Sequence, residues 1–223
     1  MKYPVSALVH RIRRPAGCLL FLLAACTTPE KKQAPVFTES YLRQSREKIQ
    51  RAETQVQSGD LIFRNGVDEV SAAARSMNRT DTSYSHCGIL FRENDRVWVY
   101  HALGGKYNPS MKLLREPLDS FCKPEENDAF GIFRYPLDSF SAAFFRHIVL
   151  SHYRKGLLFD MYFDFSTDDR MYCSEFVFKS LNQAVRNRLM PLINTDTLPF
   201  GVTTDDLFHL PGCIPVSREK FAQ

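Results

Sequence analysis

Cys173 and two histidines are the residues whose types and spacing could support nucleophilic chemistry in this chain. Cys173 precedes a segment with apolar residues at helical spacing, which are Val177, Leu181, Ala184 and Val185. A cysteine at the start of a helix lies at the positive end of the helix dipole. With a nearby histidine, this position can lower a thiol pKa from about 8.5 to roughly 3.5–7.5. Cys173 is therefore a candidate nucleophile.

His86 and His101 lie in two segments that we expect to form a β-hairpin. Strands are predicted at residues 85–91 and 97–102, joined by a tight turn at 93–96. With the turn centred between the second and third residues of 93–96, opposed residue numbers sum to 189. The two histidines then share one face of the sheet as diagonal neighbours, about 7–8 Å apart between their backbones.

Two neighbours of the histidines complete the hairpin prediction. Gly88 is expected opposite His101, where the lack of a side chain leaves room for the two rings. Cys87 alternates to the other face, so we expect it to be a core residue without a chemical role.

The three residues Cys173, His86 and His101 suggest a thiol hydrolase site. His86 is predicted to be the base that takes the thiol proton, and His101 the group that orients its ring and fixes its tautomer. A histidine lacks the fixed charge of a carboxylate. We therefore expect less stabilisation of the ion pair than the roughly 6 kcal/mol that a thiol pKa shift from about 8.5 to about 4 represents.

Two other interpretations of these residues stay open. A single histidine on a strand, or a buried cysteine in a chain rich in phenylalanine, is commonly structural. The three side chains are also the ligand types that zinc prefers, and three protein ligands would leave one position open.

The remaining pattern predicts an α+β fold of one domain, with strands grouped in the middle and helices at both ends. Further elements are predicted as helices at 39–57, 67–77 and 139–155, strands at 59–63 and 130–134, an aromatic loop at 159–165, a short helical turn at 205–209 and an apolar piece at 213–216. Loops at 65–84, 104–117 and 157–169 are expected to form the walls of the substrate pocket.

The first 25 residues have the pattern of a secretory leader. A basic start is followed by an apolar stretch at 16–25, too short to span a bilayer. The stretch ends in Leu-Ala-Ala-Cys at 23–26, which resembles a bacterial lipobox. That resemblance implies cleavage before Cys26 and lipidation of Cys26, with residues 26–38 as a tether. Thr27 implies sorting to the outer membrane if the host is Gram-negative. An ordinary signal peptide or an amino-terminal anchor is the alternative.

Removal of the leader balances the charge of the chain. The whole sequence has 29 Lys and Arg against 25 Asp and Glu, and the leader holds four basic and no acidic residues. The mature chain has no basic excess, so nothing in its charge predicts nucleic-acid binding. Membrane attachment would come from the lipid on Cys26 rather than from a basic surface.

Four other cysteines of the mature chain, which are Cys87, Cys122, Cys173 and Cys213, match no disulfide framework or metal motif, and their pairing stays open.

Several segments, taken in order, resemble one family. They are 59–63 (GDLIF), 85–89 (SHCGI), 99–102 (VYHA), 156–163, 172–177 (YCSEFV) and 204–209 (TDDLFH). Their order, with the histidine strand before the cysteine helix, resembles the permuted papain-fold amidases of the YaeF/YiiX type, which are relatives of NlpC-type peptidases. The likeness covers residues 59 to about 210.

The resemblance implies a circularly permuted papain-like fold over residues 39–223, with an antiparallel sheet packed against helices. It implies hydrolysis of an amide or ester through a thioester, with Cys173 as nucleophile, His86 as base and His101 as third member, and no cofactor. Many relatives carry Glu at the position of His101, whereas lecithin retinol acyltransferase-like relatives use a second histidine there. Phe159 also stands where a tyrosine is expected.

We therefore expect a lipid-anchored cysteine hydrolase of the bacterial cell envelope, on the periplasmic face of the outer membrane. Its substrate would be a peptidoglycan peptide or an acyl amide or ester of a lipid, and acyl transfer is a variant of the same chemistry. The alternative from another class is an inactive envelope module that binds or scaffolds, suggested by the unusual His101 and Phe159.

Overall fold

The computed structural model describes residues 36–196 and 201–221. The predicted leader at 1–25, Cys26 and most of the tether at 26–38 lie outside the described residues, so those predictions stay predictions. Within the described ranges, no helix combines the length and the apolar character needed to cross a membrane.

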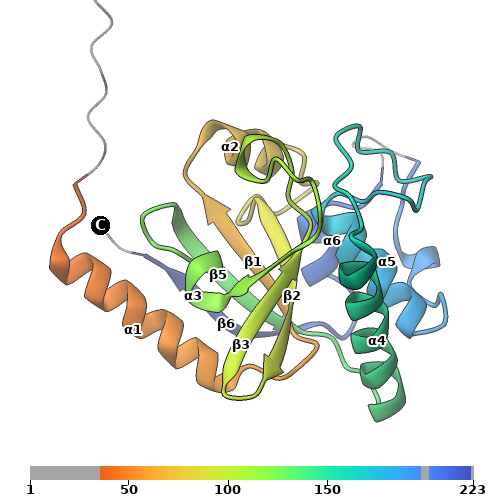
Figure 1. Cartoon of the computed structure of the whole chain (residues 1–223), viewed down its shortest axis with the longest axis horizontal. Helices are drawn as coiled ribbons and strands as arrows, with labels where there is room; N and C mark the ends of the chain where they lie inside the picture. The colour runs from red at the N-terminus through yellow and green to blue at the C-terminus, as the bar shows by residue number, and fades with distance from the viewer. Residues whose placement is uncertain (1–35, 197–200, 222–223) are drawn as a thin grey trace, which may run out of the picture. The chain divides into compact units, whose positions relative to one another are not determined.

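A six-stranded antiparallel sheet forms the centre of the fold (Figure 1). Its strands are β1 (Leu61–Gly66), β2 (His86–Glu93), β3 (Arg96–His101), β4 (Leu114–Pro117), β5 (Asn127–Arg134) and β6 (Ile214–Lys220). They are ordered β4-β3-β2-β1-β5-β6, and every neighbouring pair is antiparallel. The predicted combination of an antiparallel sheet with helices is confirmed.

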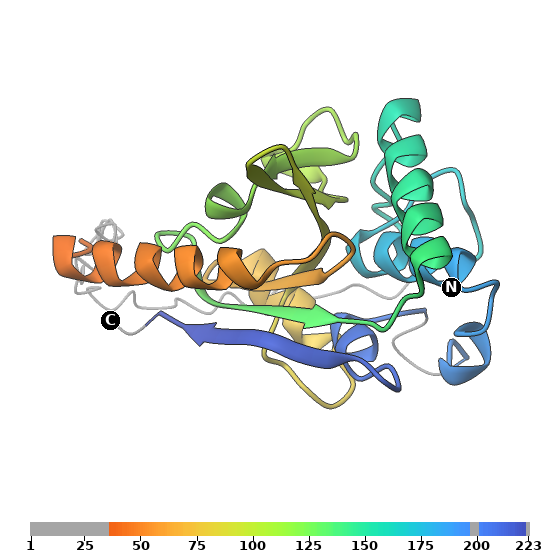
Figure 2. The same cartoon turned by 90° about the horizontal axis from the view of Figure 1, so that it is seen from below.

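Helices cover both faces of the sheet, and Figures 1 and 2 show α1 on one side with α4 and α5 on the other. The helices are α1 (Glu39–Gln55), α2 (Glu69–Ser76), α3 (Leu118–Phe121), α4 (Ser139–Lys155), α5 (Cys173–Ala184) and α6 (Thr204–Phe208), with 3-10 turns at Gly105–Tyr107 and Met190–Leu192. Helices α1 and α3 pack on one face, and α4, α5 and α6 pack on the other.

Alternation along the strands divides the core into two layers. In β1, Leu61 and Phe63 belong to the layer under α4, α5 and α6, whereas Ile62 belongs to the layer under α1 and α3. All three side chains are fully buried. A strand with apolar residues on both faces is expected when both faces of the sheet are covered.

The predicted hairpin is confirmed in its register. Strands β2 and β3 pair Ile89 with Tyr100 and Leu90 with Val99, which is the predicted sum of 189. A Cβ atom on Gly88 would lie 2.8 Å from Val99 Cγ1 and 3.0 Å from His101 Cβ. Since such distances are too short for ordinary carbon contacts, only glycine fits at this position.

The predicted helices 39–57, 67–77 and 139–155 form α1, α2 and α4 with ends that differ by no more than two residues. Two strands were not predicted: β4 lies inside a predicted loop, and β6 extends the apolar piece at 213–216 to Lys220. Helix α3 was also not predicted. Strand β4 matters most among these, because it carries a charged residue, Glu116, that contacts His101.

Candidate active site

Cys173 is the first residue of α5, as predicted from the sequence. The preceding residue, Tyr172, has extended backbone angles and donates its N–H to Glu175 Oε2 at 3.2 Å. The Tyr172 hydroxyl in turn accepts a hydrogen bond from the Val202 N–H at 2.9 Å. These contacts fix the helix start, where free backbone N–H groups and the helix dipole favour a negative charge.

The surroundings of Cys173 lower its thiol pKa well below the usual value. The largest cause is a hydrogen bond from the Cys87 thiol. Burial opposes this effect, while the charge and hydrogen bond of His86 and the backbone N–H of Cys87 add to it. A thiolate is a far better nucleophile than a thiol, and the lowered pKa favours the thiolate form of Cys173.

The other three cysteines that the structure describes do not share this environment. Burial raises the pKa of Cys87 and Cys122 well above the usual range, and it raises the pKa of Cys213 to about 12. All four are free thiols. Cys173 therefore differs from the others in its expected reactivity.

The two predicted histidines contact each other directly. His86 Nε2 lies 2.8 Å from His101 Nδ1, and the rings are nearly perpendicular. Phe121 of α3 packs against both rings, with centroids 5.7 and 5.1 Å away. His101 is fully buried, and burial lowers its pKa to about 4. At neutral pH, His101 is therefore an uncharged ring.

Glu116 is a member of the site that the sequence prediction missed. It lies on β4, and its Oε1 is 2.9 Å from His101 Nε2, although the alignment is not that of a regular hydrogen bond. Burial raises the pKa of this carboxyl, but the contact with His101 and the charges of His101, Arg64 and His86 outweigh it, so the pKa is lowered. The expectation of weaker ion-pair stabilisation was based on His101 alone, and the structure adds a carboxylate from the neighbouring strand beside it.

The expectation for Cys87 was half right. Cys87 is fully buried and belongs to the core, as predicted, but its thiol also contacts Cys173. Side chains alternate between the two faces of the sheet along β2. Cys87 therefore lies on the face that α5 covers, whereas His86 and His101 face α3. Cys173 contacts residues on both faces of β2, which are Cys87 and His86, because the start of α5 lies beside the first residues of that strand.

A cleft of about 290 Å³ opens at Cys173, His86 and Glu116. Its apolar lining consists of Val70, Ala74, Leu103, Tyr107, Leu114, Phe159 and Phe163, and its polar lining includes Arg64, Asp68, Ser71, Ser85, Ser120, Glu126 and Asn127. All three loops predicted as pocket walls contribute residues. One part of the cleft is thus suited to an apolar group and another to a polar group.

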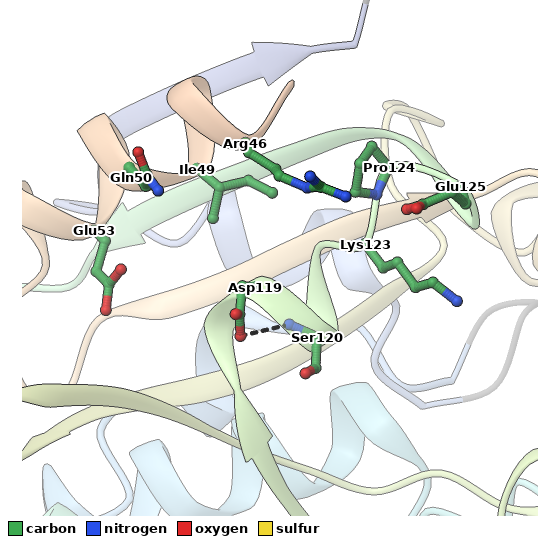
Figure 3. A pocket seen from close by; sticks show the side chains of 9 residues that line it. All are labelled: Arg46, Ile49, Gln50, Glu53, Asp119, Ser120, Lys123, Pro124 and Glu125. Atoms are coloured by element: carbon green, nitrogen blue, oxygen red, sulfur yellow. Dashed lines mark hydrogen bonds between the residues drawn. The ribbon is translucent and has the colours of Figure 1, made fainter. Parts of the chain in front are cut away.

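A second cleft, of about 360 Å³, lies between α1 and the segment around α3 (Figure 3). Its lining residues are Arg46, Ile49, Gln50, Glu53, Asp119, Ser120, Lys123, Pro124 and Glu125. Both signs of charge are present, but none of these residues is a cysteine or a histidine. This cleft therefore offers no nucleophile comparable to Cys173.

The predicted alternative of a zinc site does not fit the geometry. Among the residues that the structure describes, no group of three or more His, Cys, Asp or Glu is arranged to hold a metal ion. The facing nitrogens of His86 and His101 are directed at each other rather than at a common point. We therefore derive no chemical step through a metal at Cys173, His86 and His101.

The order of a histidine strand before a cysteine helix, on an antiparallel sheet flanked by helices, defines a permuted papain-like protein. The chain belongs to the permuted papain-like amidase family YaeF/YiiX, C92, which it matches over residues 55–197. Among solved structures it is similar to the metalloprotein YiiX from Escherichia coli O157:H7, at 22% sequence identity and a TM-score of 0.57. The match covers 74% of this chain and 99% of that chain. No curated protein matches the chain. The predicted family and fold are confirmed, and membership of an amidase family supports a hydrolase function.

Proposed function

We propose that this protein is a cysteine hydrolase that cleaves an amide or ester through a thioester on Cys173. The observation that carries the proposal is the thiol of Cys173 at the start of α5, in contact with His86 and with its pKa lowered. A nucleophile beside a base that is oriented by a third group is the general signature of covalent catalysis.

The steps follow from these contacts. His86 takes the proton of Cys173, and the thiolate attacks the carbonyl carbon of the substrate. The backbone N–H of Cys173, at the helix start, is directed to stabilise the oxyanion that forms. The imidazolium of His86 then protonates the leaving amine or alcohol, which leaves an acyl group on the sulfur. Water, activated by His86, attacks the thioester and releases the acid and the free thiol.

The two kinds of lining in the cleft support an acyl amide or ester of a lipid as the substrate. Leu103, Leu114 and Phe163 offer an apolar wall to an acyl chain, while Arg64 and Asn127 lie on the polar part. A peptidoglycan peptide is the other substrate in view. Transfer of the acyl group to an amine or alcohol would use the same thioester with a different acceptor.

The proposed location is the bacterial cell envelope, on the periplasmic face of the outer membrane. Its support is the sequence alone: the leader at 1–25, the lipobox-like end at Cys26 and the polar tether at 26–38. A lipid on Cys26 would hold the domain at the surface of the membrane, where a lipid or peptidoglycan substrate is present.

Intact mass spectrometry tests the function and can identify the substrate in the same experiment. Full-length protein is incubated with envelope extract and searched for an added mass, which we expect on Cys173. A fatty-acyl mass would identify a lipid and a peptide mass a peptidoglycan fragment. Cys173→Ala should remove the adduct, and Cys213→Ala, which removes an unactivated thiol, should keep it.

A thiol-directed probe gives an independent measurement. In the folded protein it should label Cys173 before Cys87, Cys122 or Cys213, and His86→Ala should remove this preference. Equal labelling of all four thiols would contradict the proposal. If a Cys173→Ala gene fully replaced the wild-type gene in cells, a binding or scaffolding role would be favoured instead.

A further inference from the structure

Glu116 ends a continuous line of contacts that begins at the nucleophile. Cys173 contacts His86, His86 Nε2 lies 2.8 Å from His101 Nδ1, and His101 Nε2 lies 2.9 Å from Glu116 Oε1. The last three members come from consecutive strands, β2, β3 and β4. Because β4 pairs Glu116 with Val99, the carboxylate falls on the same face as His101.

We propose that Glu116 is a positioning residue that sets the tautomers of both histidines, so that His86 presents the lone pair of Nδ1 to Cys173. This inference deepens the proposed function and rests on it. The carboxylate of Glu116 contacts His101, so it acts on His86 through His101.

The proton positions follow from charge and burial. Glu116 is ionised near neutral pH because its pKa is lowered, and His101 is neutral because burial lowers its pKa to about 4. Apart from Glu116, the described residues offer Nε2 of His101 no hydrogen-bonding partner. An N–H beside a carboxylate is attractive, whereas a lone pair there is repulsive. The single proton of His101 therefore belongs on Nε2.

The same reasoning continues to His86. With its proton on Nε2, His101 has an acceptor at Nδ1, which faces Nε2 of His86 at 2.8 Å. That contact is a hydrogen bond only if Nε2 of His86 carries a proton. The free lone pair of His86 is then on Nδ1, where it can take the thiol proton. The opposite tautomers would place a proton on Nδ1 of His86 and block it as a base.

Other charged groups around Glu116 support this arrangement. Arg64 of β1 acts on Glu116 by its charge, and its guanidinium lies 4.6 Å from the Phe121 ring while donating to the Phe121 carbonyl at 2.9 Å. His86 and His101 face Glu116 from β2 and β3, and the protonated thiol of Cys122 faces it from the end of α3. Arg64 thus helps to keep Glu116 ionised beside a neutral His101.

The pH dependence of Cys173 alkylation by a neutral haloacetamide tests the inference on the full-length protein. In Glu116→Gln the charge is lost, and the side-chain amide can donate to Nε2 of His101, which reverses both tautomers. We expect the alkylation midpoint to rise by about one pH unit, which is a roughly tenfold lower rate at a pH below the midpoint. Glu116→Asp keeps the charge, so its alkylation midpoint should rise less than that of Glu116→Gln.

Glu93→Gln is the matched control, because Glu93 is also a carboxylate with a lowered pKa but pairs with Arg115 and lines neither of the two clefts. It should leave the midpoint unchanged. An equal effect of Glu116→Gln and Glu93→Gln would overturn the inference, since it would reduce the role of Glu116 to general charge.

Nitrogen NMR of isotope-labelled histidines in the wild-type protein reads the tautomers directly, whether or not the variants fold. We expect protons on Nε2 of both His86 and His101. A proton on Nδ1 of His101 would overturn the inference. If Cys173 showed no preferential alkylation while the expected tautomers were present, the proposed function would fail and the positioning by Glu116 would stand.

Discussion

Replacement of Cys87 tests the largest cause of the lowered thiol pKa of Cys173. As a donor to the thiolate form of Cys173, the Cys87 thiol is the largest cause of the lowered pKa. Hydrogen bonds to charged groups contribute about 1.5–3 kcal/mol. At 1.36 kcal/mol per pKa unit, Cys87→Ala should raise the pKa of Cys173 by about 1–2 units.

The assay is the rate of Cys173 alkylation as a function of pH, with the modified residue located by peptide mass spectrometry. Cys87→Ser keeps a donor of similar size, so it should keep the midpoint close to that of the wild type. Cys122→Ala is the matched control, because Cys122 is equally buried but lies in the core layer on the other face of the sheet.

An unchanged midpoint in Cys87→Ala would refute the reasoning, because the thiolate would then depend on His86 and the helix start alone. An equal rise in Cys122→Ala would refute it in another way, since the shift would then come from loosening of the core. Thermal unfolding of each variant, measured in the same buffer, separates loss of packing from loss of the donor.

Two further predictions concern His101 and Cys26. The pKa of His101 is about 4 in the folded chain and about 6.5 when unfolded. Between these values the unfolded state binds more protons than the folded state. The free energy of unfolding should therefore fall by up to about 3 kcal/mol as the pH drops from 6.5 to 4. The lowered pKa of Glu116 acts in the same direction on acidification. Urea unfolding at several pH values should show a smaller loss of unfolding free energy on acidification in His101→Gln than in the wild type. Parallel plots of unfolding free energy against pH for the two proteins would contradict the lowered pKa of His101. Cells grown with a labelled fatty acid should transfer the label to the wild type but not to Cys26→Ser; equal labelling would remove the lipid anchor from the proposal.

The hairpin could be predicted from sequence because its information is local. A tight turn fixes the register, and the period of two then fixes which side chains share a face. This reasoning placed His86 beside His101 and explained Gly88. The order of the motifs was sufficient to predict the permuted papain-like fold.

Glu116 could not be found in the same way. Strand β4 has only four residues and ends at Pro117, so it shows no alternation that distinguishes it from a loop. Its place beside β3 depends on pairing with a strand that is already in the sheet, which is tertiary context. The one signal in the sequence was a carboxylate shortly after a strand that carries a histidine, and many surface residues share that pattern.

The contact between Cys87 and Cys173 was missed for a geometric reason. The alternation of side chains along β2 tells which face of the sheet carries each side chain, but not which helix end packs against that face. The prediction treated the two faces of β2 as separate, and this is true in the middle of the strand. At its first residues the start of α5 reaches both Cys87 and His86.

The position of the members along the chain has a consequence for folding. His86, His101 and Glu116 lie on three consecutive strands within residues 86–116, so they can assemble through short-range contacts with little loss of chain entropy. Cys173 joins them from a distant part of the sequence, and such contacts form more slowly. We therefore expect a partly folded chain to hold an ordinary thiol, which becomes activated only when α5 docks on the sheet. A newly synthesised chain would thus be protected from premature reaction until its fold is complete.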